Sequence, residues 1–321
     1  MDYSRAIAFL EADGPFLLST HVNADGDGLG ALLGLSGLLA KLGKPCRMVV
    51  ADDDPDRKFA FLSGFEDIQS YNDLTDHEPV SHAIFVDTPT ISAHRVGNVA
   101  RLIDQDTRTM IIDHHAVGSE EGNVVLIDSE ASAASEQIYE LMKTAGVEID
   151  AEMATQVYAG IAFDTKLFKY SHPERALKAC AELVDYGADP VSIADHLFAH
   201  QTFETVHTLG HALSTLELHY DGRVATCSVS HEVFKLGGDL DAIVDQAMSI
   251  DGVEVALFFK EQSPGYHRVS LRSRGLVDVN VIARGFGGGG HRNASGCAVE
   301  NSLGESQRGL LEAVGQALET T

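Results

Sequence analysis

Basic residues are scarce in this sequence. Its 321 residues include 23 Lys and Arg against 48 Asp and Glu, which gives a formal net charge of -25 at pH 7. Such a charge repels polyanions at long range, so extended binding to duplex nucleic acid is not expected and any anion-binding site has to be local. A metal site can use only a few of these carboxylates, and most of the acidity is therefore predicted to lie on a solvated surface.

Cysteine and long apolar runs are scarce as well. The four cysteines lack C-x-x-C spacing and lie mostly among apolar neighbours, which indicates reduced, buried thiols rather than a disulfide framework. The apolar stretch 31–40 is interrupted by Gly and Ser and is too short to span a bilayer, and the first residues do not form the basic and apolar regions of a targeting leader. We therefore expect a cytoplasmic protein with no membrane partner.

The first half of the chain alternates short apolar runs with helical patterns. It begins with an apolar run at 16–20, a helical pattern at 28–42 and a second apolar run at 47–51. Regular alternation of this kind predicts an α/β fold in which helices flank a parallel sheet. The further predicted strands are 83–86, 109–112 and 124–127, and the further helices are 132–145, 151–162 and 173–186.

A second, smaller α/β domain is predicted in the last third of the chain. We place an N-terminal domain at 1–187, a helical linker at 188–215 and the C-terminal domain at 216–321. The predicted strands of the C-terminal domain are 223–230, 253–260 and 267–272, and its predicted helices are 241–249, 280–284 and 305–318.

Side chains that can bind metals follow three of the predicted strands. Ligands of open α/β sheets gather at the carboxyl ends of strands, so these side chains are expected to lie along one edge. A single Asp in such a place is usually a turn residue or a helix cap. The combination is harder to explain in that way, because Asp164 adds a further carboxylate at the end of a predicted helix. The strand-end residues are His21, Asp25, Asp27, Asp87, Asp113, His114 and His115.

The number of these ligands exceeds what one ion needs. Mixed carboxylate and imidazole donors suit manganese, iron or cobalt better than an ion that prefers thiolates. Paired ions roughly 3.5–4 Å apart activate a water and stabilise both the attacking and the leaving oxygen of a phosphoryl displacement. The residues therefore predict hydrolysis of a phosphate ester or anhydride.

Four motifs of the sequence resemble those of the DHH phosphoesterases, and the resemblance covers nearly the whole chain. The motifs are His21-Val-Asn-Ala-Asp25-Gly-Asp27, the lone Asp87, Asp113-His114-His115 and the later Asp164. The resemblance implies one ion on His21, Asp25 and Asp87 and a second ion on Asp27, Asp87, His114 and Asp164. It also implies catalytic roles for Asp113, which orients the histidines, and for His115, which approaches the substrate phosphate and the leaving group.

The sequence Gly288-Gly-Gly-His291 matches a Gly-Gly-Gly-His motif, and through it the C-terminal part resembles the DHH-associated domain, which ends in that motif. Five of the fourteen arginines lie between residues 266 and 292, where Asp278 is the single acid. A glycine-rich backbone lets amide N–H groups approach an anion closely. The guanidinium group of Arg can donate two hydrogen bonds to phosphate oxygens. The alternative is a glycine-rich surface turn beside an ordinary basic strand. The resemblance implies substrate binding by Arg268, Arg272, Arg274, Gly288, Gly289, Gly290 and His291.

Two positions depart from the family pattern. Ala24 stands where many relatives have proline, and we expect this change to be neutral. Lys166 stands where many relatives have glycine, directly after the Asp-Thr pair of the fourth motif. A cation at that position could bind a substrate phosphate or point outward, and we favour the outward orientation.

Two pairs of histidines have the i, i+4 spacing of helical zinc ligands. They are His196 with His200 and His207 with His211. Neither pair has the acid of an H-E-x-x-H motif, so we expect exposed or interdomain histidines instead.

Two other patterns are interpreted as structural. The segment Gly26-Asp-Gly-Leu-Gly30 follows a strand and opens a helix but lacks the G-x-G-x-x-G spacing of a dinucleotide-binding loop. The acidic run Asp52-Asp-Asp54 is interpreted as a solvated turn rather than an ion site.

Within the family, the Gly-Gly-Gly-His domain argues against the manganese pyrophosphatases, and the length argues against exonucleases with further domains. The remaining type resembles oligoribonucleases and pAp phosphatases. We therefore expect a phosphodiesterase with two Mn²⁺ ions, or Co²⁺ or Mg²⁺ in their place. Its expected substrates are short RNA oligonucleotides, linear or cyclic dinucleotides and pAp, and its expected form is a homodimer.

Two alternatives stay open. One is a nucleotide-binding regulatory module with weak or lost catalysis, and the other is a DHH phosphatase that acts on another small phosphate ester. The complete set of expected ligands favours the enzyme, because a sensor need not retain a bridging carboxylate and a leaving-group histidine.

Overall fold

The computed structural model describes residues 1–115, 121–169, 173–199, 201–238, 240–290 and 292–320. The chain divides into two compact units, residues 1–200 and residues 201–321. Each unit contains one six-stranded sheet with helices packed on it. The predicted fold class, an N-terminal α/β part with a parallel sheet and a second α/β part, is confirmed.

A parallel sheet forms the centre of the first unit. Its strands are β1 (Phe16–Ser19), β2 (Cys46–Val50), β3 (Gln69–Ser70), β4 (His82–Val86), β5 (Arg108–Asp113) and β6 (Val124–Ile127). They lie in the order β3-β2-β1-β4-β5-β6, and all neighbours are parallel. Burial on both faces explains why the predicted strands are continuous apolar runs rather than alternating ones.

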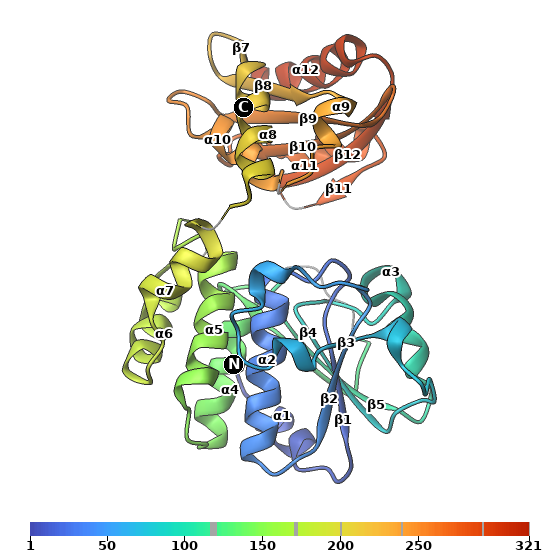
Figure 1. Ribbon diagram of the computed structural model, residues 1–321, viewed down its shortest axis with the longest axis vertical. Coiled ribbons are helices and arrows are strands. Elements are labelled where there is room, and N and C mark those ends of the chain that lie inside the picture. The colour runs from blue at the N-terminus through green and yellow to red at the C-terminus, as the bar shows by residue number, and fades with distance from the viewer. Residues whose placement is uncertain (116–120, 170–172, 200, 239, 291, 321) are drawn as a thin grey trace. The chain divides into compact units, whose positions relative to one another are not determined.

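Helices cover both faces of this sheet. Side chains such as Leu18 and Ile112 form one large apolar cluster with the helices of one face, among which α2, α4 and α5 lie side by side (Figure 1). The alternate residues Leu17 and Ile111 face the opposite layer. The first layer contains α1 (Ser4–Leu10), α2 (Gly26–Lys41), α4 (Ala134–Ala145) and α5 (Ala151–Asp164), and the opposite layer contains α3 (Ala93–Val96) and the 3₁₀ helix η4 (Gly97–Leu102).

Further helices of the first unit pack outside these layers or connect strands. The helix α6 (Pro173–Asp185) and the helix α7 (Pro190–Ala194) contact α5. A π-helical turn η5 (Asp195–Ala199) continues α7. The remaining 3₁₀ helices are η1 (Arg57–Phe59), η2 (Phe65–Asp67) and η3 (Tyr71–Asp73).

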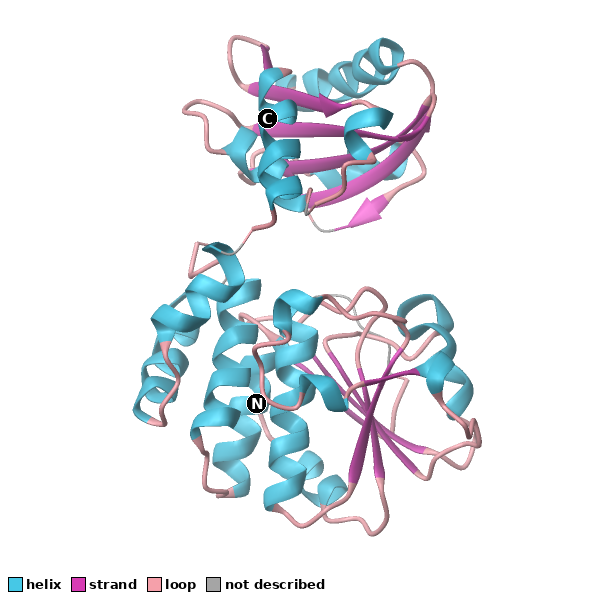
Figure 2. Cartoon of the chain, in the orientation of Figure 1, coloured by secondary structure: helices cyan, strands magenta, loops and turns pink. Residues whose placement is uncertain are grey.

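The second unit contains a mixed sheet (Figure 2). Its strands are β7 (Glu217–His219), β8 (Val224–Val229), β9 (Val255–Ser263), β10 (Tyr266–Ser273), β11 (Gly289–Gly290) and β12 (Ala294–Glu300). They lie in the order β11-β12-β10-β9-β8-β7, in which only β8 and β9 are parallel.

Two apolar clusters join the helices of the second unit to this sheet. Leu257 and Val269 belong to the cluster under α11 (Val279–Gly285) and α12 (Leu303–Glu319). Cys227 and Phe258 belong to the cluster under α8 (Phe203–Ser214) and α10 (Asp241–Met248). A short helix, α9 (His231–Phe234), follows β8.

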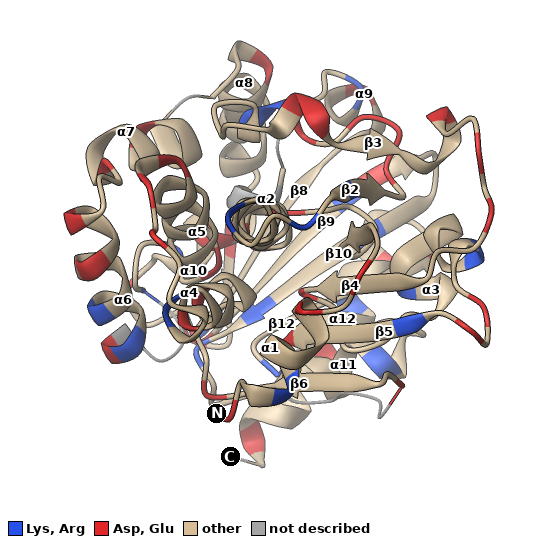
Figure 3. Cartoon of the chain, turned by 90° about the horizontal axis from the view of Figure 1, so that it is seen from below, with Lys and Arg blue, Asp and Glu red and all other residues tan. Residues whose placement is uncertain are grey.

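The cysteine prediction is confirmed, because all four cysteines are free thiols and three of them are buried. Burial raises the pKa of the Cys180 and Cys227 thiols to about 12. Among the described residues, no helix has both the length and the apolar character needed to cross a membrane. Asp and Glu are spread over many elements rather than gathered on one (Figure 3).

Candidate metal centre

The residues expected to bind metal come together at the carboxyl edge of the parallel sheet. The strands β1, β4 and β5 are direct neighbours there, and the segments that follow them carry His21, Asp87 and His114. Asp27 lies in the first turn of α2 and Asp164 is the last residue of α5, which packs against α2. Three strand ends and two helices therefore supply one cluster, whose side chains form three overlapping groups with ligand atoms within 4.8 Å of one another.

The first group consists of His21, Asp25 and Asp87. The Nε2 of His21 lies 3.2 Å from Oδ2 of Asp87 and 3.8 Å from Oδ1 of Asp25. The Nδ1 of His21 donates a hydrogen bond to the carbonyl of Val22 at 2.9 Å, so Nε2 is the nitrogen directed at the carboxylates. Asp25 also caps α2 by accepting two backbone N–H groups of its first turn.

The second group consists of Asp27, His114 and Asp164. The Nε2 of His114 lies 3.8 Å from Oδ2 of Asp27 and 3.6 Å from Oδ2 of Asp164. It also lies 3.6 Å from Oδ1 of Asp87, so Asp87 directs one oxygen to His114 and the other to His21. A carboxylate that faces two ligand groups in this way has the geometry of a bridge.

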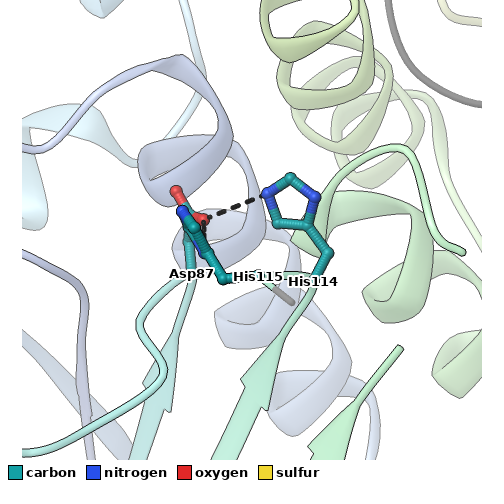
Figure 4. Close-up of side chains that lie close together, drawn as sticks. All are labelled: Asp87, His114 and His115. Carbon is teal, nitrogen blue, oxygen red and sulfur yellow. Dashed lines mark ion pairs between the residues drawn. The ribbon is translucent and has the colours of Figure 1, made fainter. Parts of the chain in front are cut away.

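The third group adds His115 to Asp87 and His114 (Figure 4). The Nδ1 of His115 donates to Oδ1 of Asp113 at 2.7 Å, and Asp113 is fully buried. Gln137 in turn donates to the backbone carbonyl of Asp113 at 2.6 Å. Asp113 therefore fixes the orientation of His115 and keeps a hydrogen on its Nδ1.

The cluster has a strongly negative field. Burial acts to lower the pKa of His21, but its hydrogen bonds to Asp25 and Asp87 prevail and raise it to about 11. Burial also acts to lower the pKa of His114, but the neighbouring carboxylates outweigh it and raise the pKa to about 10. Burial together with Asp87 raises the pKa of Asp164 to about 6, despite the opposing effect of His114. Both imidazoles thus hold protons tightly when no other cation is present.

The donor set fits divalent cations. Asp27 and Asp87 have relative exposures of 0% and 3%, and carboxylates this close together and this deeply buried are unfavourable without cations. In the part of the chain that the structure describes, no lysine or arginine forms an ion pair with either of them. Oxygen and imidazole donors in this arrangement are those of a divalent metal site.

The sequence did not indicate how Asp27 is held. Its Oδ2 accepts the backbone N–H of Ala134 at 2.6 Å and its Oδ1 accepts that of Ser135 at 2.9 Å. These amides belong to the first turn of α4, where the helix dipole favours a negative charge. The contact depends on Gly160 of α5, since a Cβ there would lie 2.0 Å from Oγ of Ser135 and 3.1 Å from Oδ1 of Asp27.

Gly160→Ala is expected to lower the free energy of unfolding by about 1–3 kcal/mol and to weaken metal binding, because the added methyl group displaces Ser135 and with it the support of Asp27. Gly210→Ala in α8 is the matched control, because nothing lies within 4 Å of a Cβ at Gly210. The control is expected to be neutral or slightly stabilising. Thermal unfolding and metal titration measure both effects, and a Gly160→Ala protein equal to wild type in both would exclude this role.

The glycines of Gly26-Asp-Gly-Leu-Gly30 also have a packing role. A Cβ at Gly26 would lie 2.4 Å from the ring of Phe163, and one at Gly30 would lie 2.6 Å from the carbonyl oxygen of Gln156. Both contacts are with α5, so the glycines allow α2 and α5 to approach closely. The interpretation of this segment as structural agrees with these contacts.

Asp52 has a specific contact that the sequence interpretation missed. Its two carboxylate oxygens accept the backbone N–H groups of Asn23 and Ala24, each at 2.8 Å. Asn23 has a φ of +56°, a conformation that the paired hydrogen bonds help to fix. Asp52 thus holds the loop between His21 and Asp25, which belongs to the first ligand group.

Asp52→Asn is expected to weaken metal binding roughly tenfold to hundredfold, because an amide offers only one acceptor to the two N–H groups and the His21 loop loses its support. Asp54→Asn removes the same charge from the same acidic run at an exposed position and serves as the control. Isothermal titration with manganese compares the two. Equal affinities for the two variants would show that Asp52 does not position the loop.

Lys166 lies beside the centre in an unusual backbone conformation. Its φ is +48°, and its ammonium group lies 4.1 Å from the centroid of the Phe163 ring, which is a cation–π distance. Phe163 directly precedes Asp164 in α5. The side chain of Lys166 is therefore held against the aromatic residue that packs next to the ligands.

The arginines expected to bind substrate lie in and beside β10 of the second unit. Arg272 places its Nε 3.7 Å from Oδ1 of Asp245. Arg274 donates hydrogen bonds to the carbonyls of Val253 at 2.9 Å and Met248 at 2.6 Å, so part of its guanidinium stabilises the fold. Arg268 is exposed on β10.

The glycine motif of the second unit forms the edge strand β11. Gly289 and Gly290 pair with β12, and a Cβ at Gly288 would lie 2.1 Å from the carbonyl oxygen of Gly296. Gly290 has a φ of +144°, which a side chain would strain. Close backbone approach thus explains the glycines, whereas His291 lies outside the described residues.

The histidine pairs do not form a metal group among the described residues. His207 and His211 have ring centroids 4.8 Å apart in an edge-on arrangement, and His207 stacks on Phe203. His196 stacks on Phe61. His200, the partner expected for His196, lies outside the described residues.

Both units of the chain are similar to known proteins. Residues 15–161 match the N-terminal domain of the DHH family, and residues 223–320 match the DHHA1 domain. A protein of Thermus thermophilus named bifunctional oligoribonuclease and PAP phosphatase NrnA is 32% identical over 312 residues, which cover 95% of this chain and 91% of that protein.

Two further proteins are also similar to this chain. The cyclic-di-AMP phosphodiesterase PdeA of Listeria monocytogenes is 29% identical over 223 residues, which cover 66% of this chain and 33% of that protein. The crystal structure of an exopolyphosphatase-related protein from Bacteroides fragilis superposes with a TM-score of 0.88 at 25% identity. That match covers 98% of this chain and 95% of the other.

Proposed function

This chain belongs to the DHH family, and from that premise we propose that it is a manganese-dependent phosphodiesterase that hydrolyses very short oligoribonucleotides and dinucleotides. The observation that carries the proposal is the position of Asp87. Its two oxygens face two ligand groups, His21 with Asp25 and His114 with its partners. A bridging carboxylate of this kind supports a pair of ions rather than one.

The proposed cofactor is a pair of Mn²⁺ ions, for which Co²⁺ or Mg²⁺ could substitute. Carboxylate oxygens and imidazole nitrogens are donors that Mn²⁺ accepts. When bound, two such ions lower the pKa of a water and stabilise charge on the oxygens of a reacting phosphate. The proposed ligands are His21, Asp25 and Asp87 for one ion and Asp27, Asp87, His114 and Asp164 for the other.

His115 and Asp113 are proposed to act on the leaving group. The hydrogen bond from Nδ1 of His115 to the buried Asp113 leaves Nε2 as the nitrogen available for a substrate. A protonated imidazole held in this way can donate a proton to the departing oxygen as the phosphorus–oxygen bond breaks. Asp113 keeps the ring of His115 in place through this hydrogen bond.

Short substrates are proposed for two reasons. The net charge of -25 opposes a long polyanion, whereas a dinucleotide needs only a local cationic site such as the segment with Arg268 and Arg272. The Thermus thermophilus relative is also named as an oligoribonuclease. Arg272, Arg274, His291 and the glycines Gly288, Gly289 and Gly290 are the residues proposed to bind the part of the substrate away from the reacting phosphate.

A substrate panel tests this assignment. Purified protein with manganese is incubated with a 5′-phosphorylated dinucleotide, a cyclic dinucleotide, a long single-stranded RNA and pyrophosphate. We expect the linear dinucleotide to be cleaved to mononucleotides much faster than the long strand, and pyrophosphate to stay intact. An intact dinucleotide under conditions that saturate the metal site would refute the substrate assignment.

A phosphatase activity on 3′-phosphoadenosine 5′-phosphate is proposed as a second function, because the Thermus thermophilus relative is named for both activities. This phosphatase activity would require the same proposed metal ligands as the phosphodiesterase. Its substrate would carry a terminal phosphate in place of a phosphodiester. Release of inorganic phosphate from pAp, absent in a variant that cannot bind metal, is the expected result.

Metal loading is expected to release protons. Since the pKa values of His21 and His114 are raised to about 11 and about 10, both rings are protonated at pH 7 in the metal-free protein and have to be neutral to bind metal. Apparent affinity should therefore rise with pH, by roughly tenfold per pH unit for each proton released. Titration calorimetry in buffers of different ionisation enthalpy counts these protons, and heats that do not depend on the buffer would contradict the expectation.

A further inference from the structure

Lys166 occupies a backbone position that disfavours a lysine side chain. At the end of α5, the N–H of Leu167 donates to the carbonyl of Ala162 at 2.9 Å. The N–H of Lys166 donates to the carbonyl of Phe163 at 3.1 Å. Together these bonds form a Schellman motif, in which the residue at the position of Lys166 is left-handed and is usually glycine. Lys166 has a φ of +48°, so the chain holds a lysine where glycine would be less strained.

The ammonium group of Lys166 is held by an aromatic ring rather than by a carboxylate. Its Nζ lies 4.1 Å from the centroid of the Phe163 ring, and no carboxylate of the described ranges forms an ion pair with it. An aromatic face attracts a cation without accepting hydrogen bonds of ordinary strength. The N–H donors of this ammonium group therefore remain available to the oxygen of a ligand.

The ring of Phe163 places this ammonium group beside the candidate metal centre. The ring fills the space that a side chain at Gly26 would need, since a Cβ there would lie 2.4 Å from it. Gly26 lies between Asp25, which belongs to the first ligand group, and Asp27, which belongs to the second. Lys166 is therefore held at the border of both groups rather than at one end of the cluster.

The charge of the centre gives a cation at this border a purpose. The proposed ligands include four carboxylates, those of Asp25, Asp27, Asp87 and Asp164, and two divalent ions supply four positive charges, which cancel them. A phosphodiester is an anion, and a centre without net charge attracts it less than a positive one does. The ammonium group of Lys166 supplies the positive charge that the ligands and the ions together lack.

We propose that Lys166 donates a hydrogen bond to a non-bridging oxygen of the reacting phosphate. The contact binds this phosphate and stabilises its charge while the phosphorus–oxygen bond breaks. The role rests on the proposed phosphodiesterase function and differs from that of the basic segment around Arg268 and Arg272, which is proposed to bind the substrate elsewhere. A diester and the terminal phosphate of pAp both have non-bridging oxygens, so the contact serves both proposed activities.

Binding of inorganic phosphate to the full-length, manganese-loaded protein tests the proposal, because this probe has a single phosphate group and no reaction is needed. Lys166→Asn is expected to weaken phosphate binding about tenfold to hundredfold, since a charge-assisted hydrogen bond is lost. Asparagine tolerates the left-handed conformation, so the helix end should be retained. Lys166→Arg, which keeps the charge, is expected to recover most of the affinity. Isothermal titration calorimetry measures these affinities.

Lys169→Asn is the matched control, because it removes the same charge from an exposed lysine of the same turn. Its affinity for phosphate is expected to equal that of wild type. Metal content and the Tm of the metal-free protein are expected to be the same for wild type and for both asparagine variants. In the hydrolysis of a dinucleotide, kcat/KM is expected to decrease about tenfold to hundredfold for Lys166→Asn alone.

The proposal is overturned if Lys166→Asn binds phosphate as wild type does, or if Lys169→Asn weakens binding equally. Loss of metal or a lower Tm in Lys166→Asn would also overturn it, because Lys166 would then support the centre rather than the phosphate. A wild-type protein that hydrolyses no dinucleotide would refute the proposed function, whereas the phosphate titration would still decide the role of Lys166.

Discussion

An Asp87→Asn protein is expected to lose divalent-metal binding and hydrolysis together. The amide can face only one cation with its oxygen, so the bridge between the two ligand groups is broken. Loss of such a bridge removes several kcal/mol of transition-state stabilisation, which corresponds to a decrease in kcat of roughly 10³-fold or more. Asparagine is the informative replacement because Asp87 has a φ of +54°, a conformation that asparagine tolerates and alanine does not.

Metal content after dialysis against manganese and kcat on a dinucleotide are the two measurements for this variant. A far-ultraviolet circular dichroism spectrum equal to that of wild type shows that the fold is retained. If Asp87→Asn kept two equivalents of metal, or turned over at near wild-type rate, Asp87 would not be the bridge.

Arg272→Ala is expected to raise KM about tenfold to thirtyfold and to leave metal content and kcat nearly unchanged. A guanidinium forms charge-assisted hydrogen bonds with phosphate oxygens, and the loss of one such partner corresponds to about 1.5–2 kcal/mol. The effect is expected to be confined to binding because Arg272 belongs to the second unit and the proposed metal ligands to the first.

Arg308→Ala is the matched control for Arg272, since Arg308 is an exposed arginine on α12 outside the basic segment. Its kinetic constants are expected to equal those of wild type. Should Arg272→Ala lose metal, or should both variants raise KM equally, the basic segment would not be a specific substrate site.

Much of the fold follows from local sequence patterns. The predicted strands at 83–86 and 124–127 correspond to β4 and β6, because buried parallel strands are short apolar runs with turn residues at their ends. The strand β12 was not predicted. Its buried positions are Ser295, Cys297 and Val299. Because Ser295 is polar and Cys297 is small, the apolar alternation was not visible.

The types of residue in the candidate metal centre could be read from the sequence, but the contacts that support them could not. The apolar runs that precede His21, Asp87 and His114 are visible in the sequence itself. The hydrogen bond from Ala134 to Asp27 joins segments that are far apart in the chain. The hydrogen bond from Ala24 is accepted by Asp52, which belongs to an acidic run that looks like an ordinary turn in the sequence. Contacts of this kind depend on how α4 and β2 pack around the site, and no local pattern encodes them.

The electrostatic state of the centre also required the structure. The number of carboxylates predicts a negative site. The pKa of Asp87 is lowered, however, whereas the pKa of Asp27 is raised. The difference depends on which of the two carboxylates contacts a histidine closely. The same holds for Arg274, whose bonds to two backbone carbonyls could not be anticipated from a basic strand.

Anomalous diffraction at the manganese edge, from crystals grown with manganese, tests the central claim most directly. The account predicts two peaks roughly 3.5–4 Å apart, one beside His21 and Asp25 and one beside His114, Asp27 and Asp164, with the carboxylate of Asp87 between them. A single peak in this cluster, or a second peak that Asp87 does not contact, would contradict it.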